Sequence, residues 1–259
     1  MRKLFVNIVL IAIGLVVFNS CEQKPDSGVE PPKPDVEDQE PEIDTGIGVE
    51  NGHEYIDLGL SVKWATCNIG AEIPEDYGDY FAWAETKSKK TYTEDNYIYC
   101  KKEVVTGQVS AWYEYHFKKY VREEDYEYNR FYDNKTKLEK KDDAAYINWG
   151  GKWRMPTEDE FNELINFCTW EKTIQNRVAG YKLTSNVDGY EDRSIFFPAA
   201  GYKSDNELNY ARTKGYYWSS TLGDNSSGAS IFYFDLDYED CDIRGKDREN
   251  GLSIRPVCP

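Results

Sequence analysis

The sequence has little of what metal-dependent and nucleotide-dependent enzymes need. It holds only two histidines, His53 and His116, and its six cysteines include no CxxC pair, so a zinc site is not expected. It contains no GxSxG, no HExxH and no glycine-rich phosphate loop, which are motifs of common hydrolases and nucleotide-binding enzymes. After residue 20 it also lacks an apolar run long enough to cross a bilayer.

Positive charge is scarce too. The chain has 31 Lys and Arg against 47 Asp and Glu, which gives a net charge of −16. Nucleic acid is therefore excluded as a partner, because phosphate binding needs clustered cations. Residues 22–50 hold ten Asp and Glu against two lysines, five of the ten prolines and no aromatic residue. This composition predicts an extended, self-repelling tether.

The N-terminus has the layout of a bacterial lipoprotein signal peptide. Arg2 and Lys3 precede an almost wholly apolar stretch, and Ser20 stands directly before Cys21. We expect cleavage after residues 1–20, a lipid on Cys21 as the membrane contact, and a tether over 21–50. The protein would then lie in the cell envelope, at the outer membrane and exposed on the surface. An ordinary secretory signal with a chance cysteine, or a short membrane anchor, is the alternative.

The folded domain is expected over residues 51–259, with two helices. The first covers 139–149 and ends at Gly150-Gly151. The second begins at a capping box formed by Thr157 and Glu160. Its apolar face has helical spacing and consists of Phe161, Leu164, Ile165 and Cys168.

Strands are expected elsewhere. Residues 54–67 suggest a first strand, and 85–135 suggest a long surface insertion with one short helix, either a binding loop or a plain connection. Beyond residue 180 the pattern predicts short strands separated by turns, at 181–184, 194–197, 216–219, 230–237 and 252–257. Two helices followed by strands and loops indicate an α+β domain, with short, mostly antiparallel strands joined by long loops.

Several segments together carry a family resemblance: GHEYIDLGLSVKWATCNIGA, EDYGDYFAWAET, DDAAYINWGGKWRMPTEDEFNELI, SIFFPAAGY, GYYWSSTL and GLSIRPV. They resemble the Fibrobacter succinogenes major paralogous domain, a module of Bacteroidetes-type surface lipoproteins, over roughly residues 52–257. The resemblance implies a C-type-lectin-like fold related to the formylglycine-generating enzymes. It also implies an extracellular, lipid-anchored module, and it supplies no catalytic residue.

These features predict a non-catalytic binding or adhesion domain with a glycan or protein ligand. The aromatic content of 15%, with 21 Tyr and 7 Trp, suits stacking on flat ligands, although such residues also build cores. One alternative is a structural subunit of a surface assembly. Another is an enzyme of formylglycine-generating type, for which Cys241 and Cys258 are the nearest cysteine pair.

Two further sites are predicted. Asp235 and Asp237 share a strand face and are calcium candidates, while a solvated acidic strand end is the alternative. No other cofactor is expected. Cys67 and Cys168 lie in family-like segments, and a disulfide between them would stabilise the fold by roughly 2–5 kcal/mol. Cys241 with Cys258 is the second pairing considered.

Overall fold

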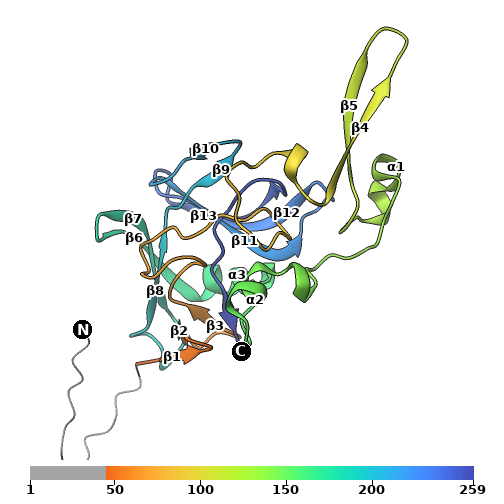
Figure 1. The fold of residues 1–259 in the computed structure, drawn as a ribbon. Coiled ribbons are helices and arrows are strands. Elements are labelled where there is room, and N and C mark those ends of the chain that lie inside the picture. The colour runs from red at the N-terminus through yellow and green to blue at the C-terminus, as the bar shows by residue number, and fades with distance from the viewer. Residues whose placement is uncertain (1–44) are drawn as a thin grey trace, which may run out of the picture. The chain divides into compact units, whose positions relative to one another are not determined.

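The computed structural model describes residues 45–259, which are built mainly from short antiparallel strands (Figure 1). One sheet has the order β1-β2-β3-β14 and consists of Ile47–Glu50, His53–Ile56, Lys63–Ala65 and Val257–Cys258. The sheet β6-β7-β8 consists of Cys168–Gln175, Val178–Ser185 and Ser194–Pro198. The sheet β11-β12-β13 consists of Lys214–Leu222, Gly228–Asp235 and Asp240–Asp247.

Two strand pairs stand apart from these sheets. They are β4 with β5, at Cys100–Thr106 and Ala111–Phe117, and β9 with β10, at Tyr202–Ser204 and Glu207–Asn209. The helices are short: α1 Tyr126–Asn129, α2 Ala144–Trp149 and α3 Glu158–Phe167, with 3₁₀ turns η1 Glu94–Asn96, η2 Glu123–Asp125 and η3 Lys140–Asp142. The β4–β5 hairpin projects from the body beside α1 (Figure 1).

The prediction of an α+β, C-type-lectin-like fold with two helices is wrong. The described residues lie mostly in small antiparallel sheets, and helix is confined to short elements. The helix expected over 139–149 contains only α2 and the 3₁₀ turn η3. The expectation relied on fold-level analogy, which did not account for the strands formed by 100–117 and 168–175.

The start of α3 agrees with the sequence. Thr157 accepts a hydrogen bond from the Glu160 amide at 3.3 Å, and Glu160 accepts one from the Thr157 amide at 2.8 Å, so the capping box is confirmed. Arg154 adds two hydrogen bonds to the Glu160 carboxylate. Phe161 and Leu164 are buried as expected, whereas Cys168 is the first residue of β6.

Strands of the C-terminal half lie close to their expected positions. The stretches 181–184 and 194–197 fall within β7 and β8, and β12 covers most of 230–237. β1 falls within residues 21–50, which the sequence had assigned to the tether. Cys21 and the predicted signal peptide over 1–20 lie outside the described residues. Among residues 45–259, the structure contains no helix with the length and apolar character needed to cross a membrane.

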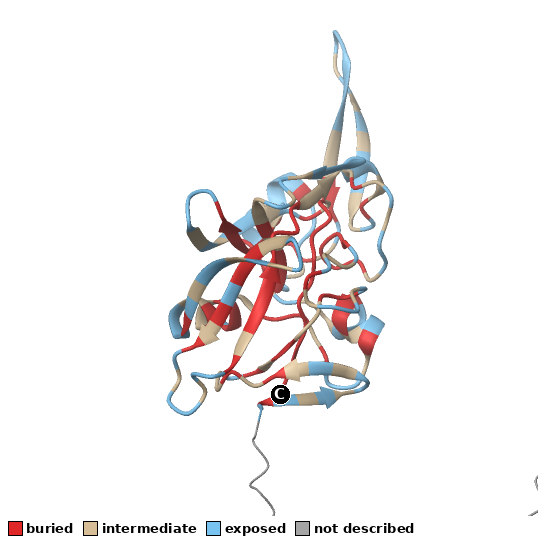
Figure 2. Cartoon of the chain, turned by 90° about the vertical axis from the view of Figure 1, so that its left-hand side faces the viewer, coloured by how far each residue is buried: buried red, intermediate tan, exposed pale blue. Residues whose placement is uncertain are grey.

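Buried residues concentrate in the body, while the projecting hairpin is exposed or intermediate along most of its length (Figure 2). One core cluster contains Trp83, Trp153 and Trp218, and a second packs α3 against β7, β8 and β12. Each of the three tryptophans donates its indole N–H to a backbone carbonyl, at 2.7 to 2.9 Å. The loop-rich body therefore supplies polar partners for these three buried indoles, whereas the buried Trp64 Nε1 has no hydrogen-bond partner among the described residues.

Arg248, directly after β13, is fully buried and holds distant segments together. Its Nε donates to the Tyr97 hydroxyl at 3.0 Å. Its other nitrogens donate to three backbone carbonyls, at 2.8 to 3.2 Å: those of Lys119, Tyr120 and Ser226. The guanidinium also lies 4.6 Å from the Phe117 ring centroid and 5.0 Å from that of Trp83. Carbonyl oxygens and ring faces thus replace the water that this cation lost.

We predict that Arg248→Met lowers the free energy of unfolding by about 3 to 5 kcal/mol, because buried carbonyls lose their donors. Urea unfolding measures this change. Arg244→Met is the matched control, since Arg244 lies on β13 just before Arg248, is exposed and pairs with Asp240 at 2.6 Å. The control should lose less than about 1 kcal/mol. Equal losses in both variants would contradict the role of Arg248.

Candidate functional site

The β4–β5 hairpin presents an aromatic row that leads toward the body. Its register pairs Val104 with Tyr113, Lys102 with Tyr115 and Cys100 with Phe117. Because alternate residues share a face, Tyr113, Tyr115 and Phe117 all lie on one side of the hairpin. Exposure falls along the hairpin, from 98% at Val109 in the tip to 8% at Phe117. The row therefore runs from solvent to a buried base.

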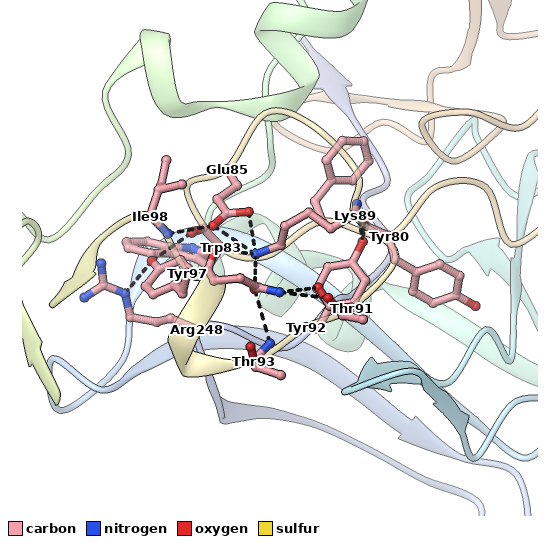
Figure 3. Close-up of polar contacts among 12 residues, drawn as sticks. Tyr80, Trp83, Glu85, Lys89, Thr91, Tyr92, Thr93, Tyr97, Ile98 and Arg248 are labelled. Carbon is pink, nitrogen blue, oxygen red and sulfur yellow. Dashed lines mark hydrogen bonds and ion pairs between the residues drawn. The ribbon is translucent and has the colours of Figure 1, made fainter. Parts of the chain in front are cut away.

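The base of the hairpin is held by a polar network around buried Glu85 (Figure 3). Glu85 Oε1 accepts from the Ile98 amide at 2.9 Å and from Lys89 Nζ at 3.1 Å. The Tyr97 hydroxyl donates to the Trp83 carbonyl at 2.9 Å and accepts from Arg248. These bonds fix the segment that enters β4.

The other side of the base is tied to α1. The Phe117 amide donates to Asn129 Oδ1 at 2.7 Å, and Asn129 Nδ2 donates to the Asp125 carbonyl at 3.0 Å. His116 Nδ1 lies 2.6 Å from the Tyr128 carbonyl and acts as the donor, since a carbonyl only accepts. The hairpin and α1 are thereby joined at a defined angle.

A cavity of about 510 Å³ opens between these elements and the loop 223–228. We call it the hairpin pocket. Its lining residues are Glu94, Tyr115, Phe117, Asp125, Tyr128, Asn129, Asn225, Ser226, Ser227, Asp247 and Glu249. Its lining combines three aromatic rings with carboxylates, amides and hydroxyls. The volume is typical of a small-molecule site, which spans about 300 to 1,000 Å³.

The pocket is acidic. Burial raises the pKa of Glu249 to about 7, and the negative charges of Asp247 and Glu94 reinforce the rise. Asp125 is already engaged, because its carboxylate accepts from the Ser226 amide at 2.8 Å. None of the described residues that line the pocket is Lys or Arg. The pocket therefore repels anions and suits ligands that donate hydrogen bonds.

The predicted disulfide between Cys67 and Cys168 is not present. Cys67, Cys100, Cys168, Cys241 and Cys258 are all free, so the second pairing is absent as well. Cys168 is packed in the core beside Phe161, and burial raises the pKa of its thiol to about 12. These cysteines act as small core or half-buried side chains rather than as cross-links.

The two predicted calcium ligands, Asp235 and Asp237, lie in different environments. Asp235 is buried, and its Oδ2 lies 2.8 Å from Lys214 Nζ and 3.1 Å from the Tyr233 hydroxyl. Its Oδ1 accepts from the Asp237 amide at 2.9 Å, while the Asp237 side chain is exposed. Within residues 45–259, no group of three or more His, Cys, Asp or Glu side chains is arranged to hold a metal ion. Asp235 thus serves as the buried partner of Lys214.

The sequence predicted the aromatic insertion at 85–135 but not the acidic residues that line the hairpin pocket. Glu249, Asp247 and Asn225 come from β13, its end and a loop, more than a hundred residues from the hairpin. They form no motif in the chain. Only the folding of the C-terminal sheet against the hairpin base brings them to one pocket.

A family model described as a domain of unknown function (DUF8237) matches residues 170–257. That match includes the loop and β13 side of the hairpin pocket and excludes the hairpin itself. No curated protein and no solved structure matches the chain.

We predict that calcium and EDTA leave the Tm unchanged, in the wild type and in Asp235→Asn alike. The physical reason is that the Asp235 oxygens are already used by Lys214, Tyr233 and the Asp237 amide. Thermal unfolding monitored by circular dichroism measures this. A calcium-dependent rise in Tm that disappears in Asp235→Asn would restore the calcium site.

We also predict a pH signature for Glu249. Its pKa is about 7 in the folded protein against a reference value of 4.5, so folding favours the protonated carboxyl. Relative to Glu249→Gln, the wild type should lose up to about 3 kcal/mol of unfolding free energy between pH 4.5 and 7, with little further change above.

Urea unfolding of both proteins at pH 4.5, 6 and 8 tests this. Glu127→Gln, an exposed position on α1, is the control and should follow the wild type at every pH. A difference between the wild type and Glu249→Gln that stays constant with pH would refute the burial of this carboxyl.

Proposed function

We propose that the protein is an envelope-anchored lipoprotein whose folded part is a non-catalytic binding domain for a neutral glycan. The lipid on Cys21, the tether and the membership of the Fibrobacter succinogenes major paralogous family are parts of this proposal, and they rest on the sequence. One observation supports the binding role above the others. It is the hairpin pocket, whose lining combines aromatic rings with hydrogen-bonding groups.

The chemistry of the pocket matches a sugar. Sugar hydroxyls donate to carboxylates and amide oxygens, and Asp247, Glu249 and Asn225 offer such acceptors. Tyr128 is 57% exposed, so part of its ring is free to pack against the apolar face of a sugar. The excess of carboxylates disfavours sulfated or acidic glycans, because anions would enter an already negative pocket.

A glycoside hydrolase is the second candidate, favoured by one observation. Burial raises the pKa of Glu249 to about 7, and Asp247 lines the same pocket; such enzymes use two carboxyl groups, one of them with a raised pKa, as acid and base. Product analysis separates the two functions. Reducing ends released by the wild type and not by Glu249→Gln would establish hydrolysis, whereas binding without release supports the proposed function.

We predict that the purified protein binds neutral glycans on an array of xylan, mannan, galactan and mucin preparations. Tyr128→Ala should weaken binding about tenfold or more, because a loss of about 1.4 kcal/mol of ring packing corresponds to a factor of ten. Tyr238→Ala is the matched control, since Tyr238 is 83% exposed on the turn after β12 and is absent from the pocket lining.

Isothermal titration with the strongest preparation gives the affinities. Binding by the wild type that falls only in Tyr128→Ala supports the pocket. No binding to any preparation by well-folded protein would refute the glycan proposal and favour a protein partner.

A further inference from the structure

The hairpin pocket does not end at the loop 223–228. A second cavity of about 340 Å³ shares Asn225, Ser227 and Asp247 with it. A third cavity of about 270 Å³ reaches α3 and shares Gly223, Asp224 and Gly245 with the second. Because neighbouring cavities have common lining residues, the three lie in a row from the hairpin base to the start of α3. We call this row of cavities the loop groove.

Glycines line the loop groove where a side chain would obstruct it. Gly228 pairs with Asp247 and Gly245 pairs with Ser230 across β12 and β13, while Gly223 lies in the adjacent loop. A Cβ placed on Gly245 would meet no heavy atom within 4 Å, so open space lies above this residue. Gly245 borders both the second and the third cavity, and it marks the middle of the groove.

The walls of the loop groove are polar. The second cavity is lined by Gly, Asp, Asn, Ser and Lys, and none of its described lining residues has an apolar side chain. The third cavity adds Glu158, Asn162, Ser230 and Arg244, and Ile243 is the one apolar side chain among its described lining residues. Such walls offer donors and acceptors together, as an uncharged hydroxyl requires. Burial of apolar surface contributes little here, so a ligand must be held by hydrogen bonds.

One residue that lines the third cavity has an unused hydroxyl. Ser230 is only 3% exposed, and its Oγ has no hydrogen-bond partner in the described part of the chain. It lines the cavity next to Asn162. Buried polar groups are normally paired, and an unpaired one in the wall of a cavity indicates a position that a ligand atom fills.

We propose that the ligand is an oligosaccharide chain that lies along the loop groove, from the hairpin pocket across Gly245 to Ser230, rather than a single terminal sugar. This inference rests on the proposed glycan binding. A peptide added to the open edge of β13 is the competing occupant. Peptide docking relies on apolar anchor pockets as well as strand pairing, and the second cavity has no such pocket.

The test uses xylo-, manno-, galacto- and mucin-derived oligosaccharides of one to six units, prepared from the same materials as the array. In the wild type, affinity should rise at least tenfold from the shortest binding fragment to the hexamer. Gly245→Trp places an indole in the open space of the groove, and it should remove that gain while leaving the affinity for the shortest fragment within about twofold. Ile174→Trp is the control, because Ile174 is 72% exposed on β6 and should preserve the gain.

The outcomes separate this inference from the proposed function. If the protein binds glycans on the array but its affinity does not change with the length of the oligosaccharide, the proposed binding along the loop groove is refuted. The proposed binding in the hairpin pocket would then still hold. A length-dependent gain that persists in Gly245→Trp would also overturn the groove. If the protein binds none of the oligosaccharides and nothing on the array, both the loop-groove inference and the proposed glycan binding are refuted. Binding of a β-strand peptide that Gly245→Trp abolishes, without length-dependent sugar binding, would assign the groove to a peptide.

Discussion

The buried guanidinium of Arg248 is the contact on which the candidate site depends. It bonds to Tyr97 before β4, to the carbonyls of Lys119 and Tyr120 after β5, and to the carbonyl of Ser226 in the loop 223–228. Within residues 45–259 the hydrogen-bond partners of Arg248 include no carboxylate, so neutral oxygens and aromatic faces compensate for the desolvation of this cation. One side chain therefore sets the spacing between the hairpin base, the loop and the end of β13, which are the walls of the pocket.

The charge of the candidate site depends on which carboxylates have a cationic partner. The buried carboxylates of Glu85 and Asp235 each have a lysine, at 2.8 Å in both cases, and both support the fold. The carboxylates around the hairpin pocket have no such lysine or arginine in its described lining. The chain thus leaves several carboxylates without a cationic partner in the described lining of this pocket, whereas the buried carboxylates of Glu85 and Asp235 are paired with lysines.

Local signals in the sequence predicted local structure well. The Thr157–Glu160 capping box depends on four consecutive residues, and the strands near 181–184 and 194–197 depend on alternation within one segment. The hairpin was missed because both of its faces carry aromatic and charged residues, which removes the alternation that marks a half-buried strand. The pocket was missed because Glu249 and Asn225 meet Tyr115 only through long-range packing. Fold-level analogy from short motifs failed for the same reason, since those motifs specify turns and caps rather than the order of strands.

The two ends of the β4–β5 hairpin differ in how firmly they are held. Its inner end, at His116 and Phe117, is hydrogen-bonded to α1. Its tip turns through residues 107–110, where the Gly107 amide donates a hydrogen bond to the Ser110 carbonyl. Chain added at such a tip costs little conformational entropy and disturbs no buried contact. The tip is therefore a suitable insertion point for a fluorescent or affinity tag, and a length change there would leave the walls of the pocket in place.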